Sequence, residues 1–247
     1  MGVPPDVVLL RSADAEAPDR YRAACREAGL RAVCKPVLAF AFPQQAQLRT
    51  HLESADRHAA LLVTSPRAVT ALARVFSDHA PLAQRWAGRR AYTVGPKTAE
   101  RLRSIGLRPR GADTGTAEAL AARITNEAPD APLLFLSGNR RRDTLSEALR
   151  AAAVPFEEVV VYETHIRADL GLPAPKQEAW LVFFSPSGLD AVRQAADADV
   201  QDYRVAAIGP TTAGALEAEG HVVEAVADTP SPNGLVAALR AAAGPPS

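Results

Sequence analysis

The chain has 247 residues, which fits one large domain or two small ones, and its 47% hydrophobic content suffices for a buried core. Its 28 basic and 28 acidic residues cancel to a formal net charge of zero. We therefore expect no general affinity for nucleic acid or for a membrane surface, since both need a basic surplus. No apolar run reaches the roughly 18 residues that span a bilayer.

Short apolar runs alternate with segments of helical periodicity along the whole chain. In chain order, the runs predict strands at 7–10, 33–42, 61–63, 90–94, 133–136, 159–162, 180–184 and 205–208. Helices are expected between them, including 21–28, one that begins at Pro66 and one from Pro232 to Gly244. Repeated strand–helix units of this kind predict parallel sheets with helices on both faces.

The same short phrases occur twice, about half a chain length apart. With their first residues, the pairs are TSPR (Thr64) and FSPS (Phe184), YTVGPKT (Tyr92) and AAIGPTT (Ala206), and DTGT (Asp113) and DTPS (Asp228). VVLLRS near the N-terminus also resembles PLLFLSGN in mid-chain. The sequence therefore predicts a structural duplication of four strand–helix units.

Two extended stretches, 35–42 and 159–166, occupy matching places after the first unit of each copy. They are the best candidates for a two-stranded crossover between two domains. The predicted limits are 1–36 with 168–247 for one domain, 44–158 for the other, and 37–43 with 159–167 for the linker strands. A simple division into N-terminal and C-terminal halves is the alternative.

Each repeated phrase ends an apolar run and opens a helix with Ser, Thr, Gly or Pro. Helix starts of this kind leave backbone N–H groups free to bind anions. Two sets of such turns predict a cleft for a ligand with many negative charges. The candidate turns are Ser65-Pro66, Gly95 to Thr98, Gly138-Asn139, Ser185 to Gly188 and Pro210 to Thr212. For each hydroxyl, simple helix capping is the alternative.

Basic residues lie next to two of these turns. Arg67 follows the first Ser-Pro turn. Its side chain is expected either to contact the ligand or to form a salt bridge on an exposed helix face. Arg140, Arg141 and Arg142 are predicted at the start of a helix, where the helix dipole disfavours cations. That unfavourable placement indicates a functional role for at least one of these arginines.

Signatures of several other chemistries are missing from the sequence. It contains no G-x-G-x-x-G after a strand, no Walker A motif and no G-x-S-x-G elbow. The five histidines lack metal-ligand spacing, so no metal site is predicted, and we expect most of them on the surface. The two cysteines, Cys25 and Cys34, are expected to pack as small apolar residues in a reducing, cytoplasmic compartment.

Taken together, VVLLR, FSPSGL, VGPKTAERLRSIGL, FLSGNRRRDTLSEAL, VVVYET, VAAIGPTTAGALEAEG and TPSPNGLVAAL resemble the uroporphyrinogen-III synthase family from Val7 to Leu239. The resemblance implies two flavodoxin-like α/β domains joined by a β-ladder linker. It also implies a lyase of heme biosynthesis that uses no metal or organic cofactor. Its substrate, the linear tetrapyrrole hydroxymethylbilane, loses water and closes to uroporphyrinogen III with ring D inverted.

Residue roles are expected from the turns and the resemblance together. Tyr162, in VVVYET, matches the family tyrosine that protonates the departing hydroxide, and aromatic packing between domains is the alternative. The expected substrate-binding residues are Ser65, Arg67, Gly95, Thr98, Gly138, Asn139, Ser185, Ser187, Gly188, Thr211 and Thr212.

The sequence leaves the oligomeric state of the protein, and its class as enzyme or binding module, with alternatives. Nothing in the sequence demands more than a monomer, and a transient contact with the enzyme that supplies the bilane is expected. A non-catalytic binding module for an anionic tetrapyrrole is the alternative to the enzyme.

Overall fold

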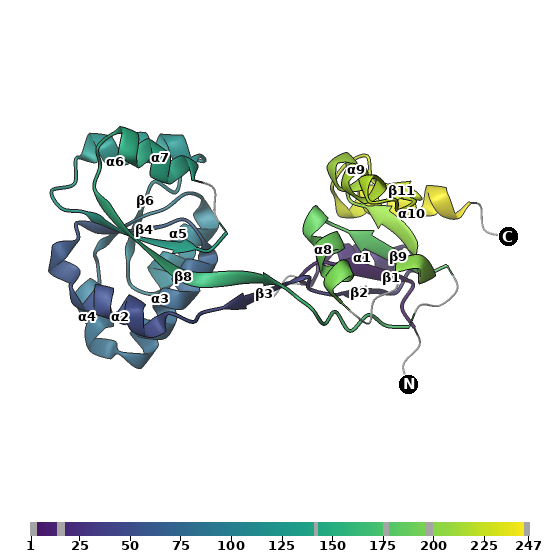
Figure 1. Ribbon diagram of the computed structural model, residues 1–247, viewed down its shortest axis with the longest axis horizontal. Coiled ribbons are helices and arrows are strands. Elements are labelled where there is room, and N and C mark those ends of the chain that lie inside the picture. Colours follow the sequence, from purple (N-terminus) through teal and green to yellow (C-terminus); the bar gives the residue numbers. More distant parts are fainter. Residues whose placement is uncertain (1–3, 14–17, 141–142, 175–177, 196–199, 245–247) are drawn as a thin grey trace. The chain divides into compact units, whose positions relative to one another are not determined.

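The computed structural model describes residues 4–13, 18–140, 143–174, 178–195 and 200–244 (Figure 1). The chain divides into two compact units. Unit 1 comprises Met1–Ala39 and His165–Ser247, and unit 2 comprises Phe40–Thr164. Two peptide connections therefore join the units, at residues 39–40 and 164–165.

Unit 1 is built on a five-stranded sheet in which all neighbouring strands run parallel. The strands are β1 (Val7–Leu10), β2 (Ala32–Cys34), β9 (Trp180–Phe183), β10 (Arg204–Ala207) and β11 (Ala225–Val226). The helices are α1 (Arg20–Glu27), α8 (Pro186–Gln194), α9 (Pro210–Ala218) and α10 (Pro232–Ala243). The order β2-β1-β9-β10-β11 is the 2-1-3-4-5 order of flavodoxin-like folds.

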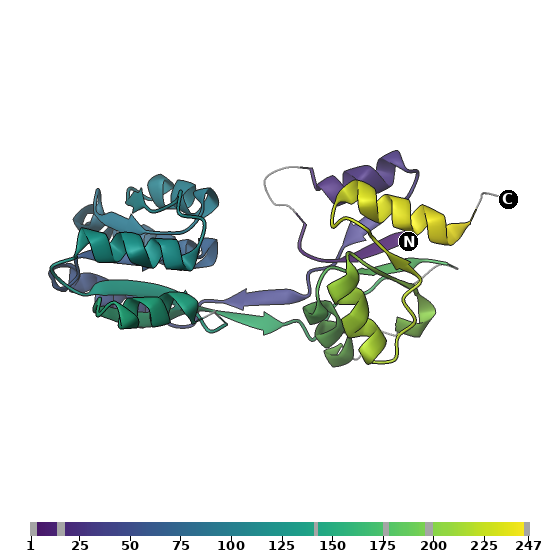
Figure 2. The same cartoon turned by 90° about the horizontal axis from the view of Figure 1, so that it is seen from above.

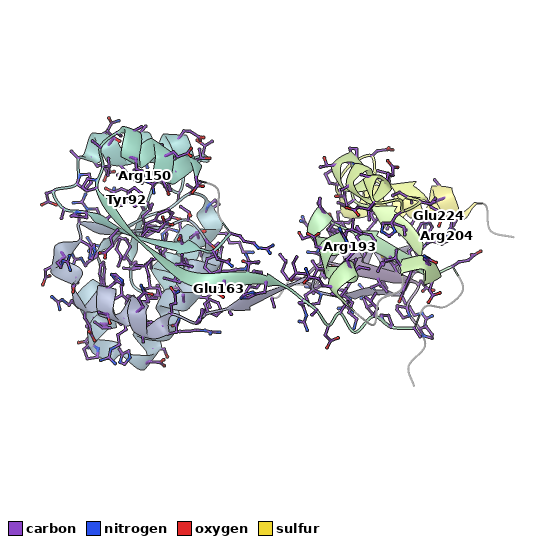
Figure 3. The ribbon with its side chains drawn as sticks, viewed as in Figure 1. Tyr92, Arg150, Glu163, Arg193, Arg204 and Glu224 are labelled. Atoms are coloured by element: carbon purple, nitrogen blue, oxygen red, sulfur yellow. The ribbon has the colours of Figure 1, made fainter. Side chains whose placement is uncertain are left out.

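Helices cover both faces of this sheet because successive strand residues point to opposite faces. Val8 and Leu181 pack in one core with α8 and α9, whereas Val7 and Val182 pack in the other with α1 and α10 (Figure 2). An ion pair joins β10 to the segment before β11, where Arg204 donates to Glu224 over 2.9 Å (Figure 3).

Gly214 offers a simple test of the helix α9. It lies inside the helix, and a Cβ built there meets nothing within 4 Å. Gly214→Ala is therefore expected to stabilise the protein by about 1 kcal/mol, because alanine loses less backbone entropy in a helix. Thermal unfolding should show a melting temperature raised by about 2–4 °C. A lowered melting temperature would contradict the packing described here for α9.

Unit 2 carries a six-stranded sheet in the order β3-β8-β7-β4-β5-β6, of which β3 and β8 extend by two residues each into unit 1. Its strands are β3 (Leu38–Ala41), β4 (Ala60–Val63), β5 (Arg90–Tyr92), β6 (Arg108–Arg110), β7 (Leu133–Gly138) and β8 (Phe156–Ile166). Its helices are α2 (Gln45–Glu53), α3 (Pro66–Asp78), α4 (Ala80–Trp86), α5 (Pro96–Ser104), α6 (Ala117–Glu127) and α7 (Thr144–Ala151). The strand pairs β8–β7, β7–β4, β4–β5 and β5–β6 are all parallel.

The core of unit 2 follows the same alternation. Leu61 and Leu134 pack with α2, α3, α4 and α5 on one face, and Leu62 and Phe135 pack with α6 and α7 on the other. Unit 2 is therefore also a three-layer α/β/α arrangement. The predicted α/β class with parallel sheets is confirmed.

The two sheets share one strand order, as the repeated phrases predict. The order β8-β7-β4-β5-β6 in unit 2 corresponds to β2-β1-β9-β10-β11 in unit 1. The register agrees too, since Leu133 pairs with Ala60 as Val7 pairs with Trp180. The N-terminal strand β1 of unit 1 thus corresponds to the fourth strand of the parallel series in unit 2, β7.

One sequence interpretation is wrong. Helix α7 begins at Thr144, with Asp143 as its N-cap, so Arg140 lies before the helix and not in its first turn. The dipole argument for a functional arginine therefore does not apply to it. Arg141 and Arg142 lie outside the described residues.

Candidate functional site

In an open parallel sheet, the strand order reverses at one point, and ligands bind beyond the carboxyl ends of the strands there. This switch point lies between β1 and β9 in unit 1 and between β7 and β4 in unit 2. Thr64 and Ser65 follow β4, and Ser137 and Gly138 end β7. The topology thus brings two of the predicted turns together in unit 2.

A pocket of about 620 Å³ lies at this switch point of unit 2. The predicted residues that line it are Ser65, Gly138 and Tyr162. The sequence analysis missed the other lining residues, which are Thr64, Val94, Gly115, Thr116, Ala117, Glu118, Phe135, Ser137, Thr144 and Leu145. The pocket is therefore rich in hydroxyl groups, and one exposed carboxylate, that of Glu118, lies among them.

Helix N-termini surround the pocket. The Ser65 hydroxyl accepts a hydrogen bond from the Arg67 N–H over 3.2 Å at the start of α3, so the capping alternative holds for this residue. Thr116 caps α6 in the same way, while the N-cap of α7 makes no side-chain capping bond. Because the N-terminal end of a helix carries a partial positive charge, the start of α3 favours an anion, whereas the starts of α6 and α7 carry the carboxylates of Glu118 and Asp143, which offset that charge.

Tyr162 is 8% exposed and its ring packs directly on Gly138. A Cβ at position 138 would lie 2.3 Å from the Tyr162 Cζ and 2.6 Å from its hydroxyl oxygen. Only glycine accommodates the ring in this position. Among the described residues, the structure shows no hydrogen bond to the Tyr162 hydroxyl.

Asn139 has a structural task that the sequence did not reveal. Its side-chain Oδ1 accepts from the Thr164 N–H over 2.8 Å, and its backbone N–H donates to the Tyr162 carbonyl over 3.2 Å. These bonds continue the β7–β8 pairing beyond the irregularity at Ser137 and Gly138. Asn139 therefore fixes the segment that carries Tyr162, and it is not among the residues that line the pocket.

The Arg67 guanidinium stacks on an aromatic ring. Its Cζ is 3.6 Å from the centroid of Phe40. Burial lowers the pKa of the Arg67 guanidinium, the nearby Tyr162 opposes that change, and Arg101 adds to it. Among the described residues Arg67 makes no ion pair, so the surface salt bridge considered above is not found there.

The remaining predicted residue pair of unit 2 lies at the start of α5. Gly95 is the N-cap with φ 84°, a backbone conformation that favours glycine, and Thr98 is buried in the first turn. Neither residue lines the pocket, although their neighbour Val94 does.

The predicted residues of unit 1 lie at the corresponding helix starts. Ser185 is the N-cap of α8 but makes no capping bond; its hydroxyl lies 3.0 Å from that of Ser187. Gly188 is buried against Phe183. Thr211 is exposed and Thr212 is buried in the first turn of α9. All follow the carboxyl ends of β9 and β10, so they share one edge of the unit 1 sheet.

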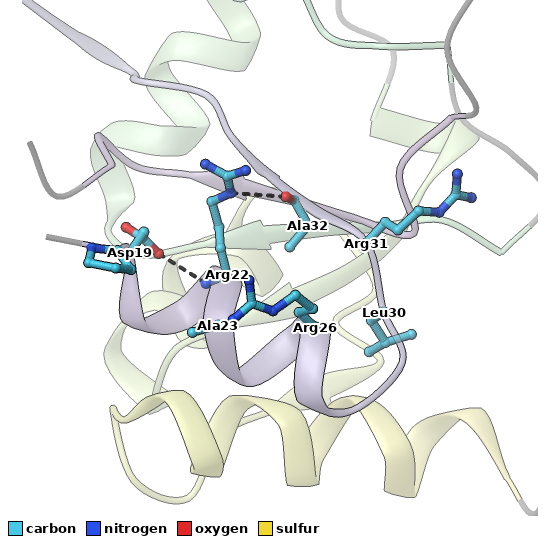
Figure 4. A pocket seen from close by; sticks show the side chains of 8 residues that line it. Asp19, Arg22, Ala23, Arg26, Leu30, Arg31 and Ala32 are labelled. Atoms are coloured by element: carbon cyan, nitrogen blue, oxygen red, sulfur yellow. Dashed lines mark hydrogen bonds between the residues drawn. The ribbon is translucent and has the colours of Figure 1, made fainter.

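A second pocket, of about 390 Å³, lies beside α1 in unit 1 (Figure 4). It is lined by Pro18, Asp19, Arg22, Ala23, Arg26, Leu30, Arg31 and Ala32, none of which was predicted as a site residue. Asp19 is engaged in capping α1, and Arg22 donates to the Ala32 carbonyl over 3.3 Å. The pocket reaches the amino end of β2, away from the strand ends where parallel sheets bind ligands.

Most of the histidines were expected on the surface, and His58 is the buried one, with 3% of its surface exposed. Its Nε2 lies 2.9 Å from Glu157 Oε2, and His51 Nδ1 lies 3.3 Å from Glu157 Oε1. The hydrogen bond with His58 lowers the pKa of Glu157, partial burial opposes this, and the charges of His51, His58 and Arg57 reinforce it.

This contact predicts a pH-dependent stability. A carboxylate whose pKa falls on folding stabilises the protein at any pH above its ordinary pKa of 4.5. This stabilisation is lost as the pH falls through the lower pKa of the folded state. Glu157→Gln should lower the melting temperature by about 1–3 °C at pH 7, since the carboxylate is partly exposed. Melting curves should show that gap closing below about pH 4. A gap that persists unchanged at about pH 3, where the carboxylate is protonated, would contradict the assignment.

Other chemistries find little support in the described ranges. They contain no group of three His, Cys, Asp or Glu side chains that could hold a metal ion. Burial raises the pKa of the Cys25 thiol to about 11, which leaves it a poor nucleophile. Among the same residues, no helix combines the length and apolar character needed to cross a membrane.

The two parallel sheets define an α/β protein with a hydroxyl-rich pocket at the switch point of unit 2. A family model described as uroporphyrinogen-III synthase HemD matches residues 19–237, so the chain belongs to the uroporphyrinogen-III synthase family. The uroporphyrinogen-III synthase of Saccharomyces cerevisiae is 30% identical over 204 residues, which cover 72% of this chain and 74% of that protein. The Schizosaccharomyces pombe enzyme is 28% identical over 237 residues, with coverages of 90% and 91%.

Solved structures agree with this membership at the level of the fold. The uroporphyrinogen-III synthetase of Helicobacter pylori matches with a TM-score of 0.61 and 19% identity over 94% of this chain and 97% of that one. A mutant uroporphyrinogen III synthase of Thermus thermophilus matches with a TM-score of 0.53 and 16% identity over 96% and 98%. The family resemblance predicted from the sequence phrases is confirmed, and the chain is an enzyme of tetrapyrrole biosynthesis.

Proposed function

We propose that the chain is a cyclising hydro-lyase that converts hydroxymethylbilane to uroporphyrinogen III. The observation that carries the proposal is the pocket of about 620 Å³ at the switch point of unit 2. There a phenol with no hydrogen bond among the described residues lies in a ring of helix N-termini. Such a site provides both a proton donor and an environment that favours carboxylates.

Recognition of the bilane follows from its eight carboxylates. Helices α5, α7, α8 and α9 begin without a side-chain capping bond. The first residue of α5, α8 and α9 is proline, which has no N–H group, so the N–H groups of the next residues, Lys97, Ser187 and Thr211, are the ones offered to an anion. Each charge-assisted hydrogen bond contributes roughly 1.5–3 kcal/mol. We propose that the helix starts of each unit offer contacts to carboxylates, with Ser65, Arg67, Gly95, Thr98 and Gly138 as contact residues in unit 2 and Ser185, Ser187, Gly188, Thr211 and Thr212 in unit 1. We now assign Asn139 to holding the Tyr162 segment.

The first chemical step breaks the carbon–oxygen bond of the hydroxymethyl group. The adjacent pyrrole nitrogen supplies the electron pair, and the Tyr162 proton converts the departing hydroxide to water. The substituted carbon of ring D then bonds to the activated carbon, and the resulting spiro intermediate rearranges with ring D inverted. Loss of a ring proton restores the pyrrole and returns a proton to the tyrosinate. The sequence involves no oxidation or reduction, which supports a reaction without a metal or organic cofactor.

Inversion depends on geometry, since the free bilane closes without it. Holding the two reacting ends in place can lower a barrier by about 7–11 kcal/mol. A pocket that keeps water from the cationic intermediate also prevents its hydrolysis.

The proposal also covers the oligomeric state, the cellular location and the domain limits of the protein. The only exposed large hydrophobic side chains in the described residues are Val222 and Val226, which supports a monomer. We keep the cytoplasmic location, the transient contact with the bilane-supplying enzyme and the domain limits 1–36 with 168–247 and 44–158 as proposals. The two compact units support those limits.

A coupled assay with freshly generated hydroxymethylbilane tests the function. Oxidised products are separated by chromatography, and the type III isomer is expected to predominate over the type I isomer of spontaneous closure. Tight tetrapyrrole binding with only type I product would instead identify a binding module, and neither binding nor type III product would refute the proposal.

A further inference from the structure

We propose that Ser137 is a substrate-contacting residue whose hydroxyl donates a hydrogen bond to a carboxylate arm of the tetrapyrrole. This inference rests on the proposed function. It concerns a side chain that no sequence phrase marked as a contact, because Ser137 belongs to the buried end of β7 and not to a helix start.

The Ser137 hydroxyl is buried without a partner. The residue is 3% exposed, and its Oγ makes no hydrogen bond. A buried hydroxyl without a partner destabilises a folded protein, so most such groups are satisfied. Ser137 also lines the pocket that holds Tyr162. The oxygen itself is covered, so a ligand reaches it once the short side chain turns about its single torsion toward the pocket; an unsatisfied donor in this place is a group that a ligand can complete.

The duplicated fold shows that this position faces the switch point. Leu136 pairs with Val63 as Leu10 pairs with Phe183, so Ser137 corresponds to Arg11 of unit 1. The Arg11 guanidinium lies 4.9 Å from the Tyr21 ring centroid and 5.5 Å from that of Phe184.

These two aromatic residues identify the space that Arg11 fills. By the same correspondence, Tyr21 is equivalent to Leu145 and Phe184 to Thr64, both of which line the pocket of unit 2. In unit 1 this position is thus occupied by a guanidinium that also bonds Asp19. In unit 2 the short side chain of Ser137 leaves the space open and offers a donor.

The surroundings select the chemistry of the partner group. The starts of α3 and α7 lie at the same pocket, and the start of α3, which has no acidic residue in its first turn, favours negative charge, whereas the Asp143 carboxylate stands at the start of α7. A serine hydroxyl that donates to a carboxylate between two helix starts forms a charge-assisted hydrogen bond. An acetate or propionate arm of the tetrapyrrole supplies that carboxylate. The exposed Glu118 carboxylate on the same pocket disfavours a second negative charge near it.

The test compares Ser137→Ala with Ser146→Ala. Ser146 is a matched control, because its hydroxyl is also buried and without a partner in unit 2 but does not line the pocket. Ser137→Ala is expected to lower kcat/KM for hydroxymethylbilane by roughly 10- to 100-fold, mainly through KM. Ser146→Ala should keep wild-type kinetics. Neither substitution should lower the melting temperature of the free protein, since each removes an unsatisfied polar group.

The outcomes separate this inference from the proposed function. If wild type forms the type III isomer and both variants match its kinetics, Ser137 makes no useful contact and the inference is overturned. If Ser137→Ala loses activity together with several degrees of melting temperature, the hydroxyl acts on the fold and the inference is again wrong. Absence of type III product from the wild-type chain would instead refute the proposed function.

Discussion

Tyr162→Phe is expected to lower kcat by about 100-fold or more while it changes the affinity for uroporphyrinogen III little. Phenylalanine keeps the ring that packs on Gly138 and removes only the hydroxyl, which has no hydrogen bond among the described residues. The loss therefore falls on proton donation to the departing hydroxide and not on packing.

Isomer analysis strengthens this test. When enzymatic closure slows, spontaneous closure competes, so the share of type I product should rise in the variant. Tyr92→Phe is a suitable control in the same unit, since the Tyr92 hydroxyl donates to Glu127 over 2.7 Å and does not line the pocket. Wild-type turnover in Tyr162→Phe would remove the tyrosine from the mechanism.

Gly138→Ala is expected to abolish most activity and to destabilise the protein by about 1–3 kcal/mol, the usual result of overpacking. The added methyl group would lie 2.3 Å from the Tyr162 ring, so the ring must move out of its place in the pocket. Stability is measured by denaturant unfolding and activity by the coupled assay.

A matched pair of glycines makes this outcome specific. Gly214→Ala introduces the same methyl group where nothing lies within 4 Å, and it is expected to stabilise the protein without loss of turnover. If Gly138→Ala keeps full activity and stability, the close packing between Gly138 and Tyr162 is not what positions the phenol.

Strands that end in a repeated turn could be predicted from the sequence because their pattern is local. The apolar runs before Ser65 and Ser185 are fully buried strands, and the following Pro-led segments are helices. Strand β6 gave no such signal, because Arg108–Arg110 is a short polar edge strand. Its Pro109 is tolerated only because edge strands need fewer ladder hydrogen bonds.

The site was only partly predictable, since its geometry depends on contacts between distant segments. Ser65 and Tyr162 could be chosen from their phrases, yet Thr116 and Thr144 reach the pocket only through the strand order. The role of Asn139 depends on the irregular β7–β8 register, which no sequence period reveals. The same limit explains why Ser137, inside a buried strand, was missed.

The most direct test of the account is a crystal structure of the chain with uroporphyrinogen III bound. We predict that the product occupies the pocket of unit 2, with its macrocycle against Tyr162 and a carboxylate at the helix start of Ser65. Product bound elsewhere, with this pocket empty and the Tyr162 hydroxyl far from the macrocycle, would contradict the account.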